Sequence, residues 1–287
     1  MEILDEILKE KIRSFLKEDI GYGDITSNFI IPDDLKLKAV VISDESGVVA
    51  GIREAKILCE IMKLDYKILI NDGKKIKKYS KIFEISGNAR SILAIERTLL
   101  NILMRMSGIT TIIDKLVKSV KVVNKKLKIA CTRKTTPGFR YFQKRAVQIG
   151  GGDTHRYRLD DMVLIKDNHL FCIDNLENTI KSLKEQLSFS KKIELEVKTK
   201  EDALKAAKFG VDILMLDNFS PKMAEEVINE LKNKNLRKGI YLELSGNITP
   251  GNILEYAKLD VDIISMGFLT HSVKALGMSL DIIEKMK

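Results

Sequence analysis

Five cationic or potentially cationic side chains lie in three short segments near the middle of the chain. They are Arg133, Lys134, His155, Arg156 and Lys166. Pro137-Gly138 predicts a loop after the first segment, and three consecutive glycines precede the second. Arginine binds a carboxylate or phosphate through two parallel hydrogen bonds, whereas lysine acts as a point charge. Each residue alone could equally form a surface ion pair, but the set predicts a pocket that selects small anions.

Acidic side chains accompany two of the predicted strands. Glu194 and Glu196 alternate along one strand and therefore point to the same face. Glu196 lies at the end of its strand, and Asp217 follows the next strand along the chain. Such carboxylates could hold Mg²⁺ on a pyrophosphate or accept hydrogen bonds from ribose hydroxyls, or they could pair with neighbouring lysines.

Two glycine-containing segments near the end of the chain offer backbone amides without bulky side chains. They are Ser245-Gly246-Asn247 and Met266-Gly267-Phe268. In α/β barrels the loops after the last two strands commonly bind phosphate. With the cations and carboxylates, they predict a pocket for a small polyanion, a phosphate monoester and a magnesium-bound pyrophosphate.

Short apolar runs alternate with helical patterns in the second half of the chain and predict the elements that position these groups. The six predicted strands are Lys128–Thr132, Met162–Ile165, Ile193–Val197, Asp212–Leu216, Gly239–Leu244 and Asp262–Ser265. Strands joined by crossover helices form a parallel sheet, either an α/β barrel or an open doubly wound sheet. We favour the barrel, because charged, serine or glycine residues follow all six strands, at the rim where barrel enzymes carry their active sites.

The first hundred residues predict a small mixed α/β unit. Apolar residues at helical spacing indicate a helix within residues 2–18, and short β-prone runs follow it. Further helices are expected at about Arg53–Met62 and over Ser91–Met106, with Gly108 marking the end of the last one.

The bulk composition limits the classes of protein that need to be considered. The chain has 287 residues and a formal net charge of +9, but its lysines are spread throughout with acids among them. A solvated basic surface is therefore favoured over a nucleic-acid-binding stripe. The cysteines and histidines show no metal-ligand spacing, so no structural metal or disulfide is expected. No apolar stretch is long enough to span a membrane, and the acidic start of the chain is unlike a signal peptide, so we predict a cytoplasmic protein.

Eight segments spread over nearly the whole chain resemble the quinolinate phosphoribosyltransferase family, also called decarboxylating nicotinate-nucleotide pyrophosphorylase. They are Gly23–Ser27, Gly47–Gly51, Glu96–Thr98, Thr132–Arg140, Gly150–Arg156, Leu164–His169, Leu216–Asn218 and Gly267–Ser272. The chain departs from the family pattern at Asn247, where a second glycine is usual. Because asparagine tolerates a positive φ, we expect that loop to keep its shape.

The resemblance implies an α/β enzyme with an N-terminal α/β sandwich over residues 1–110 and an incomplete six-stranded α/β barrel over 111–271. A helix at about 272–287 is expected to pack with the first domain. The resemblance also implies a homodimer as the smallest unit, with a hexamer left open, and Mg²⁺ without an organic cofactor. The implied reaction joins quinolinate to phosphoribosyl pyrophosphate and releases carbon dioxide, giving nicotinate mononucleotide for NAD synthesis.

The family's site residues carry over by matching position. Those implied to bind the quinolinate carboxylates are Arg133, His155, Arg156 and Lys166, joined by Arg97 of the partner subunit. Lys134 and Lys166 would contact pyrophosphate, and Glu196 and Asp217 would hold ribose hydroxyls or magnesium. These four residues form the implied catalytic set. The residues implied to bind the 5′-phosphate are Ser245, Gly246 and Gly267, and Asn247 is a further implied substrate-binding residue.

Three alternatives remain open from the sequence. A paralogue of the same fold could act on another base, as the molybdenum-associated relatives do. A class I aldolase could use Lys166 as a Schiff-base nucleophile, because a lysine at the barrel rim is also the aldolase arrangement. A basic nucleic-acid-binding protein would instead show steep salt-dependent DNA retention without pyrophosphate release.

Overall fold

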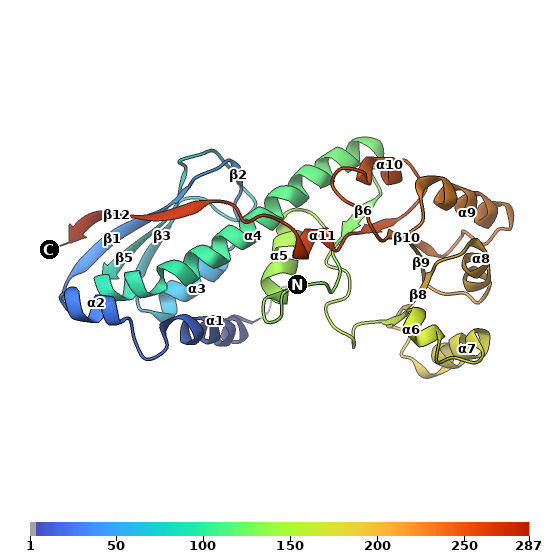
Figure 1. Cartoon of the computed structure of the whole chain (residues 1–287), viewed down its shortest axis with the longest axis horizontal. Helices are drawn as coiled ribbons and strands as arrows, with labels where there is room; N and C mark the ends of the chain where they lie inside the picture. Colours follow the sequence, from blue (N-terminus) through green and yellow to red (C-terminus); the bar gives the residue numbers. More distant parts are fainter. Residues whose placement is uncertain (1–3, 287) are drawn as a thin grey trace. The chain divides into compact units, whose positions relative to one another are not determined.

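The computed structural model describes residues 4–286, which form two compact units (Figure 1). The first unit contains the chain up to Asp114, the segment Tyr141–Gly151 and the chain from Val273 onward. The second contains Lys115–Arg140 and Gly152–Ser272. This division differs from the predicted boundary near residue 110, because the chain returns to the first unit at 141–151. Among the described residues, no helix is both long and apolar enough to cross a membrane.

The first unit is built on a four-stranded antiparallel sheet with strand order β12-β1-β5-β3. Its strands are β1 (Lys36–Ser43), β3 (Asp65–Ile68), β5 (Lys81–Asn88) and β12 (Met278–Met286), and a separate pair is β2 (Gly47–Val48) with β4 (Lys75–Ile76). Its helices are α1 (Asp5–Ile20), α2 (Ile25–Ile30), α3 (Ile52–Ile61), α5 (Arg140–Ile149) and the first part of α4 (Ala89–Val123). The predicted mixed α/β character of this region is confirmed.

The expected C-terminal helix at 272–287 is wrong. Residues Met278–Met286 form strand β12, which pairs antiparallel with the whole of β1 from Ser43↔Met278 to Lys36↔Met286. Residue 287 lies outside the described part of the chain. The backbone groups at the open edge of β1 bind this segment as a strand, and tertiary pairing of this kind overrides local preference.

Helix α4 also differs from the prediction, because it continues through Gly108 to Val123. A Cβ atom at Gly108 would overlap the carbonyl oxygen of Lys274 and lie 3.0 Å from Ala275 Cα. Gly108 therefore does not end the helix. It lets the chain that leads into β12 pass close to the helix backbone.

We expect Gly108→Ala to lower the free energy of unfolding by about 1–3 kcal/mol or more, because a methyl group would push two backbone segments apart. The matched control is Gly251→Ala, whose Cβ would come no closer than 3.7 Å to Thr249 Oγ1. Chemical denaturation of both variants measures the difference. Equal stability of the two variants would contradict this account of the helix.

The second unit is a six-stranded parallel sheet with strand order β6-β11-β10-β9-β8-β7. The strands are β6 (Lys128–Ala130), β7 (Val163–Ile165), β8 (Ile193–Val197), β9 (Ile213–Asp217), β10 (Tyr241–Ser245) and β11 (Ile263–Ser265). The helices are α6 (Asp167–Leu170), α7 (Leu176–Gln186), α8 (Lys200–Lys208), α9 (Pro221–Asn233), α10 (Ile253–Ala257) and α11 (Phe268–His271). All six predicted strands are confirmed within two residues at each end.

The sheet of the second unit is an incomplete barrel. Within residues 4–286 its edge strands, β6 and β7, share no ladder, and β6 is instead bridged by Ala130↔Asp153. The crossover helices begin at capped positions, as where Thr199 accepts from Asp202 N and Ser220 accepts from Met223 N. Because all the paired strands are parallel, their carboxyl ends and the loops that follow them lie at one rim.

Candidate functional site

A cavity of about 600 Å³ lies at the carboxyl ends of the strands in the second unit. Ten of the twelve predicted site residues line it, namely Arg133, Lys134, His155, Arg156, Lys166, Glu196, Asp217, Ser245, Gly246 and Asn247. Gly267 lies beside it, because a Cβ there would be 2.9 Å from Lys134 Cδ. Arg97 is exposed on α4 in the first unit.

The strands bring these side chains together through their two-residue repeat. Positions two apart on one strand, such as Met215 and Asp217 or Glu243 and Ser245, line the same cavity. The inner faces of β9 and β10 therefore each contribute one side chain at the strand end and another deeper in the sheet.

Several cations gather on the loops at one side of the cavity. Arg133 Nε is buried and has no hydrogen-bond partner among the described residues. Burial, followed by the neighbouring charge of Arg133, lowers the pKa of Arg156 from its usual value. Arg140 joins two of the loops, because its guanidinium donates to Thr135 Oγ1 at 3.0 Å and to the carbonyl oxygen of Tyr157 at 3.1 Å. Arg133 and Arg156, which with Lys166 we call the cationic wall of the cavity, repel each other, and a bound anion would stabilise them.

Two carboxylates stand at the rim of the cavity. Lys166 Nζ donates to Glu196 Oε2 at 2.5 Å, and Asn218 Nδ2 donates to Asp217 Oδ2 at 2.8 Å. The neighbouring pair of Lys198 and Asp167, at 2.7 Å, extends the charged rim. Glu196 therefore holds the ammonium group of Lys166 in place at the edge of the cavity.

The loop after β10 has the close backbone approach expected of a phosphate-binding segment. Gly246 has φ +85, and a Cβ there would lie 2.6 Å from Asn218 Cγ. Asn247 has φ +52, so asparagine does adopt the left-handed conformation expected at this position. Its Nδ2 donates to Asn218 Oδ1 at 2.9 Å, which ties the loop after β10 to the loop after β9.

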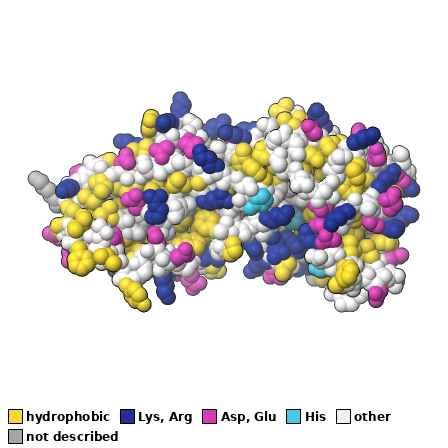
Figure 2. Space-filling model, viewed as in Figure 1, with side chains coloured by type: hydrophobic (Ala, Val, Ile, Leu, Met, Phe, Trp, Pro, Cys, Tyr) yellow, Lys and Arg dark blue, Asp and Glu magenta, His cyan; other side chains and the backbone are white. Residues whose placement is uncertain are grey.

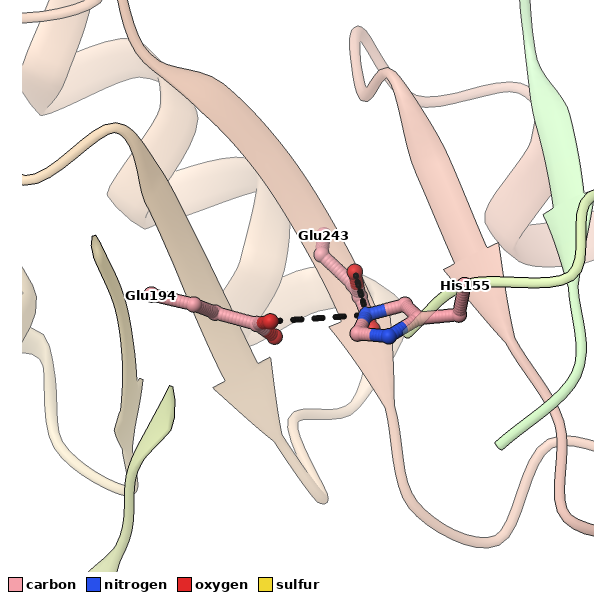
Figure 3. Close-up of side chains that lie close together, drawn as sticks. All are labelled: His155, Glu194 and Glu243. Atoms are coloured by element: carbon pink, nitrogen blue, oxygen red, sulfur yellow. Dashed lines mark ion pairs between the residues drawn. The ribbon is translucent and has the colours of Figure 1, made fainter. Parts of the chain in front are cut away.

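At the floor of the cavity, the ring of His155 contacts two fully buried carboxylates, as the dashed lines in Figure 3 show. His155 Nε2 lies 3.4 Å from Glu194 Oε2 on β8 and 3.3 Å from Glu243 Oε2 on β10. The two-residue repeat of the strand predicted Glu194 on this face without a role of its own, and Glu243 was missed. A glutamate inside an otherwise apolar predicted strand was the signal that could have found both.

The contacts of His155 with its neighbours determine which of its ring nitrogens carries a proton. Burial alone would lower the pKa of His155, but hydrogen bonds and charge from Glu194 and Glu243 raise it to about 10. His155 Nδ1, however, accepts a hydrogen bond from the backbone N–H of Arg156 at 2.8 Å, so the ring proton belongs on Nε2. We therefore assign any further proton to Glu194, because burial raises the pKa of its carboxyl group.

The cluster is also the one group of metal-ligand type among the described residues whose ligand atoms all lie within 4.8 Å of one another. Its imidazole presents a protonated nitrogen to the carboxylates, which does not suit a metal ligand. Glu196 and Asp217, the predicted magnesium ligands, form no such cluster there. Their link to magnesium stays a prediction.

Figure 2 shows lysine and arginine side chains over both units of the face in view, with acidic side chains among them. The ion pairs of the second unit follow this pattern, as with Lys200–Glu230 and Lys232–Asp260. Paired, dispersed charges favour a solvated surface over a continuous basic stripe.

Two models of known protein families match this chain. A family model described as "Quinolinate phosphoribosyl transferase, C-terminal domain" matches residues 109–281, and the corresponding N-terminal domain model matches residues 24–107. The chain belongs to the quinolinate phosphoribosyltransferase family. The resemblance inferred from the sequence is therefore confirmed.

Individual relatives extend the likeness over the full length. The chain is 49% identical over 275 residues to a protein of Methanocaldococcus jannaschii named "Probable nicotinate-nucleotide pyrophosphorylase [carboxylating]", covering 95% of this chain and 96% of that one. A protein of the same name from Archaeoglobus fulgidus is 46% identical, covering 92% and 99%. The crystal structure of nicotinate-nucleotide pyrophosphorylase from Ehrlichia chaffeensis is 33% identical with a TM-score of 0.90, covering 99% and 100%.

Proposed function

We propose that this enzyme is a pentosyltransferase that transfers phosphoribosyl from phosphoribosyl pyrophosphate to quinolinate and releases pyrophosphate and carbon dioxide. The product would be nicotinate mononucleotide, for NAD synthesis. The main support is a single cavity that combines a cationic wall, a carboxylate rim and a glycine-containing loop. Family membership and the names of the relatives support the same reaction.

The cationic wall is proposed to bind the two carboxylates of quinolinate. Arg133 and Arg156 would form forked hydrogen bonds, and Lys166 would add a point charge. The unpartnered Nε of Arg133 supports this role, because a buried donor without a partner costs free energy that a carboxylate would recover. His155 is proposed to belong to this subsite at the floor of the cavity, where its Nε2 faces Glu194 and Glu243.

The rim is proposed to bind the ribose and pyrophosphate. Lys134 and Lys166 would neutralise the leaving group, and Glu196 and Asp217 would accept hydrogen bonds from ribose hydroxyls or hold Mg²⁺. Both carboxylates line the cavity, and oxygen donors of this kind suit Mg²⁺. When bound, Mg²⁺ would neutralise charge on the pyrophosphate.

The glycine-containing loops are proposed to bind the 5′-phosphate. Gly246 and Gly267 leave room for close approach, because a Cβ at either position would overlap a neighbouring side chain. Ser245 and Asn247 flank Gly246 and line the same cavity. A phosphate fixed there would orient the anomeric carbon toward the quinolinate nitrogen.

In the proposed reaction the ring nitrogen of quinolinate attacks the anomeric carbon as the bond to pyrophosphate breaks. Positive charge that develops on the ribose is stabilised by Glu196 and Asp217, and negative charge on pyrophosphate by Lys134 and Lys166. When the adjacent carboxylate departs as carbon dioxide, the electron pair of the broken C–C bond stays on the ring carbon, where the neighbouring positive nitrogen stabilises it. The carbon that loses this carboxylate then takes up a proton.

Mass spectrometry of the products tests the proposal. Quinolinate and phosphoribosyl pyrophosphate should give nicotinate mononucleotide, and each substrate alone should give none. A borohydride-stable adduct on Lys166 with a carbonyl substrate would favour the aldolase alternative instead. A mononucleotide formed from another base but not from quinolinate would favour a paralogous transferase.

A homodimer is proposed as the smallest active unit, with Arg97 completing the pocket of the partner subunit. We expect Arg97→Ala and Lys134→Ala each to be inactive alone. After subunit exchange, half of the dimers are mixed and each has one intact pocket, so about a quarter of wild-type activity should return.

Verified exchange that restores no activity would show that Arg97 does not act across the dimer. Lys121→Ala, which removes another exposed cation from α4, is the matched control and should stay active alone. Assembly beyond the dimer and the cytoplasmic location stay predictions from the sequence.

A further inference from the structure

The loop that carries His155 and Arg156 adopts an unfavourable backbone conformation. His155 has φ +50, in the left-handed region that a residue with a Cβ rarely occupies. Such a conformation persists only where surrounding contacts over-determine it. The contacts of His155 therefore indicate what holds this loop in place.

Backbone contacts fix one end of the loop. Asp153 is bridged to Ala130 of β6, and Asp153 Oδ1 accepts from His155 N at 2.8 Å. At the other end, the ring of His155 supplies the restraint, because Nδ1 accepts from the backbone N–H of Arg156 at 2.8 Å. The ring orientation thus determines where the backbone of Arg156 lies.

The ring itself is held by the two buried glutamates. Glu194 and Glu243 extend from β8 and β10, on either side of β9, and the dashed lines in Figure 3 join both carboxylates to the ring of His155. Their side chains have no exposure and that of His155 is 10% exposed. Within residues 4–286 none of the four carboxylate oxygens has a hydrogen-bond partner, although His155 Nε2 lies within 3.4 Å of one oxygen of each glutamate. Two buried carboxylates without other partners would be costly unless the imidazole N–H satisfied them.

We propose that Glu194 and Glu243 are positioning residues, which hold the Nε2–H form of the His155 ring so that its loop presents Arg156 to the cavity. The catalytic part of this inference rests on the proposed function. Glu243 lines the cavity, but its proposed role, like that of Glu194, is exerted on the His155 ring and not on the substrate. Their effect reaches the anion through the ring, the Arg156 N–H and the Arg156 side chain.

The first test is the protonation of the ring in the whole protein. The chain has three histidines, so nitrogen–proton correlation spectra resolve their rings, and the signal lost in His155→Asn identifies His155. At pH 8 we expect a proton on Nε2 and none on Nδ1. A protonated Nδ1 would overturn the proposal, because the bond from Arg156 N–H could not exist.

The second test removes the acceptors. The double variant Glu194→Leu with Glu243→Leu should lose the fixed Nε2–H form and raise KM for quinolinate about tenfold or more, with a much smaller change in kcat. The double variant with glutamine at both positions keeps two acceptors and should retain the ring form and most of the affinity. Glu54→Gln, which alters a fully buried glutamate of the first unit, should change neither readout.

An unchanged ring signal and unchanged KM in the leucine variant would overturn the proposal. So would a Zn²⁺- or Mn²⁺-induced rise in melting temperature that the glutamine variant abolishes, because the cluster would then be a metal site. If the wild type transfers no phosphoribosyl group, the proposed function fails, and the ring spectra of the variants still decide whether the glutamates position His155.

Discussion

Lys134→Ala should lower kcat by roughly a hundredfold or more while the fold is retained, because an ammonium group that neutralises a leaving pyrophosphate acts mainly in the transition state. The structure gives this lysine a fixed place. Its backbone N–H donates to Thr132 Oγ1 at 3.1 Å, and its carbonyl oxygen accepts from Thr270 Oγ1 at 2.7 Å. The side chain lines the cavity beside Gly267, the proposed 5′-phosphate site.

The control for this prediction is Lys222→Ala, which removes an exposed lysine from α9. Both variants should have the circular dichroism of the wild type. If Lys134→Ala turns over as fast as Lys222→Ala, Lys134 does not act on the leaving group.

Discrimination between quinolinate and nicotinate should also be large. Nicotinate lacks one carboxylate, so it would leave part of the cationic wall without a partner. An unpaired charge in such a site costs about 2–5 kcal/mol, which corresponds to roughly thirtyfold or more in kcat/KM. Competition between the two bases at one concentration of phosphoribosyl pyrophosphate measures the ratio, and comparable use of both would contradict the assigned base subsite.

The parallel sheet could be predicted from the sequence because its strands are short apolar runs bounded by polar residues. Strand β8 is buried along its whole length, as expected for a strand covered on both faces. The helix α5 was missed, since it buries polar residues that hide its period. Among them, Arg145 pairs with Glu54 at 3.3 Å and Asp72 at 3.0 Å, partners far away in the sequence.

The rim of the site was predictable for the same physical reason as the sheet. Residues that follow parallel strands must meet at one edge, so Lys166, Glu196 and Asp217 could be grouped before any distance was known. The cluster of His155, Glu194 and Glu243 at the floor of the site was not predictable in this way. The link from His155 to Glu243 depends on a loop conformation with positive φ, which glycine-rich spacing allows but does not specify.

The most direct test of the central claim is the stoichiometry of the products. With quinolinate and phosphoribosyl pyrophosphate supplied, the enzyme should release carbon dioxide and pyrophosphate in equal amounts, and neither should form when one substrate is omitted. Pyrophosphate release without carbon dioxide, or carbon dioxide release that does not require phosphoribosyl pyrophosphate, would contradict the proposed decarboxylating transfer.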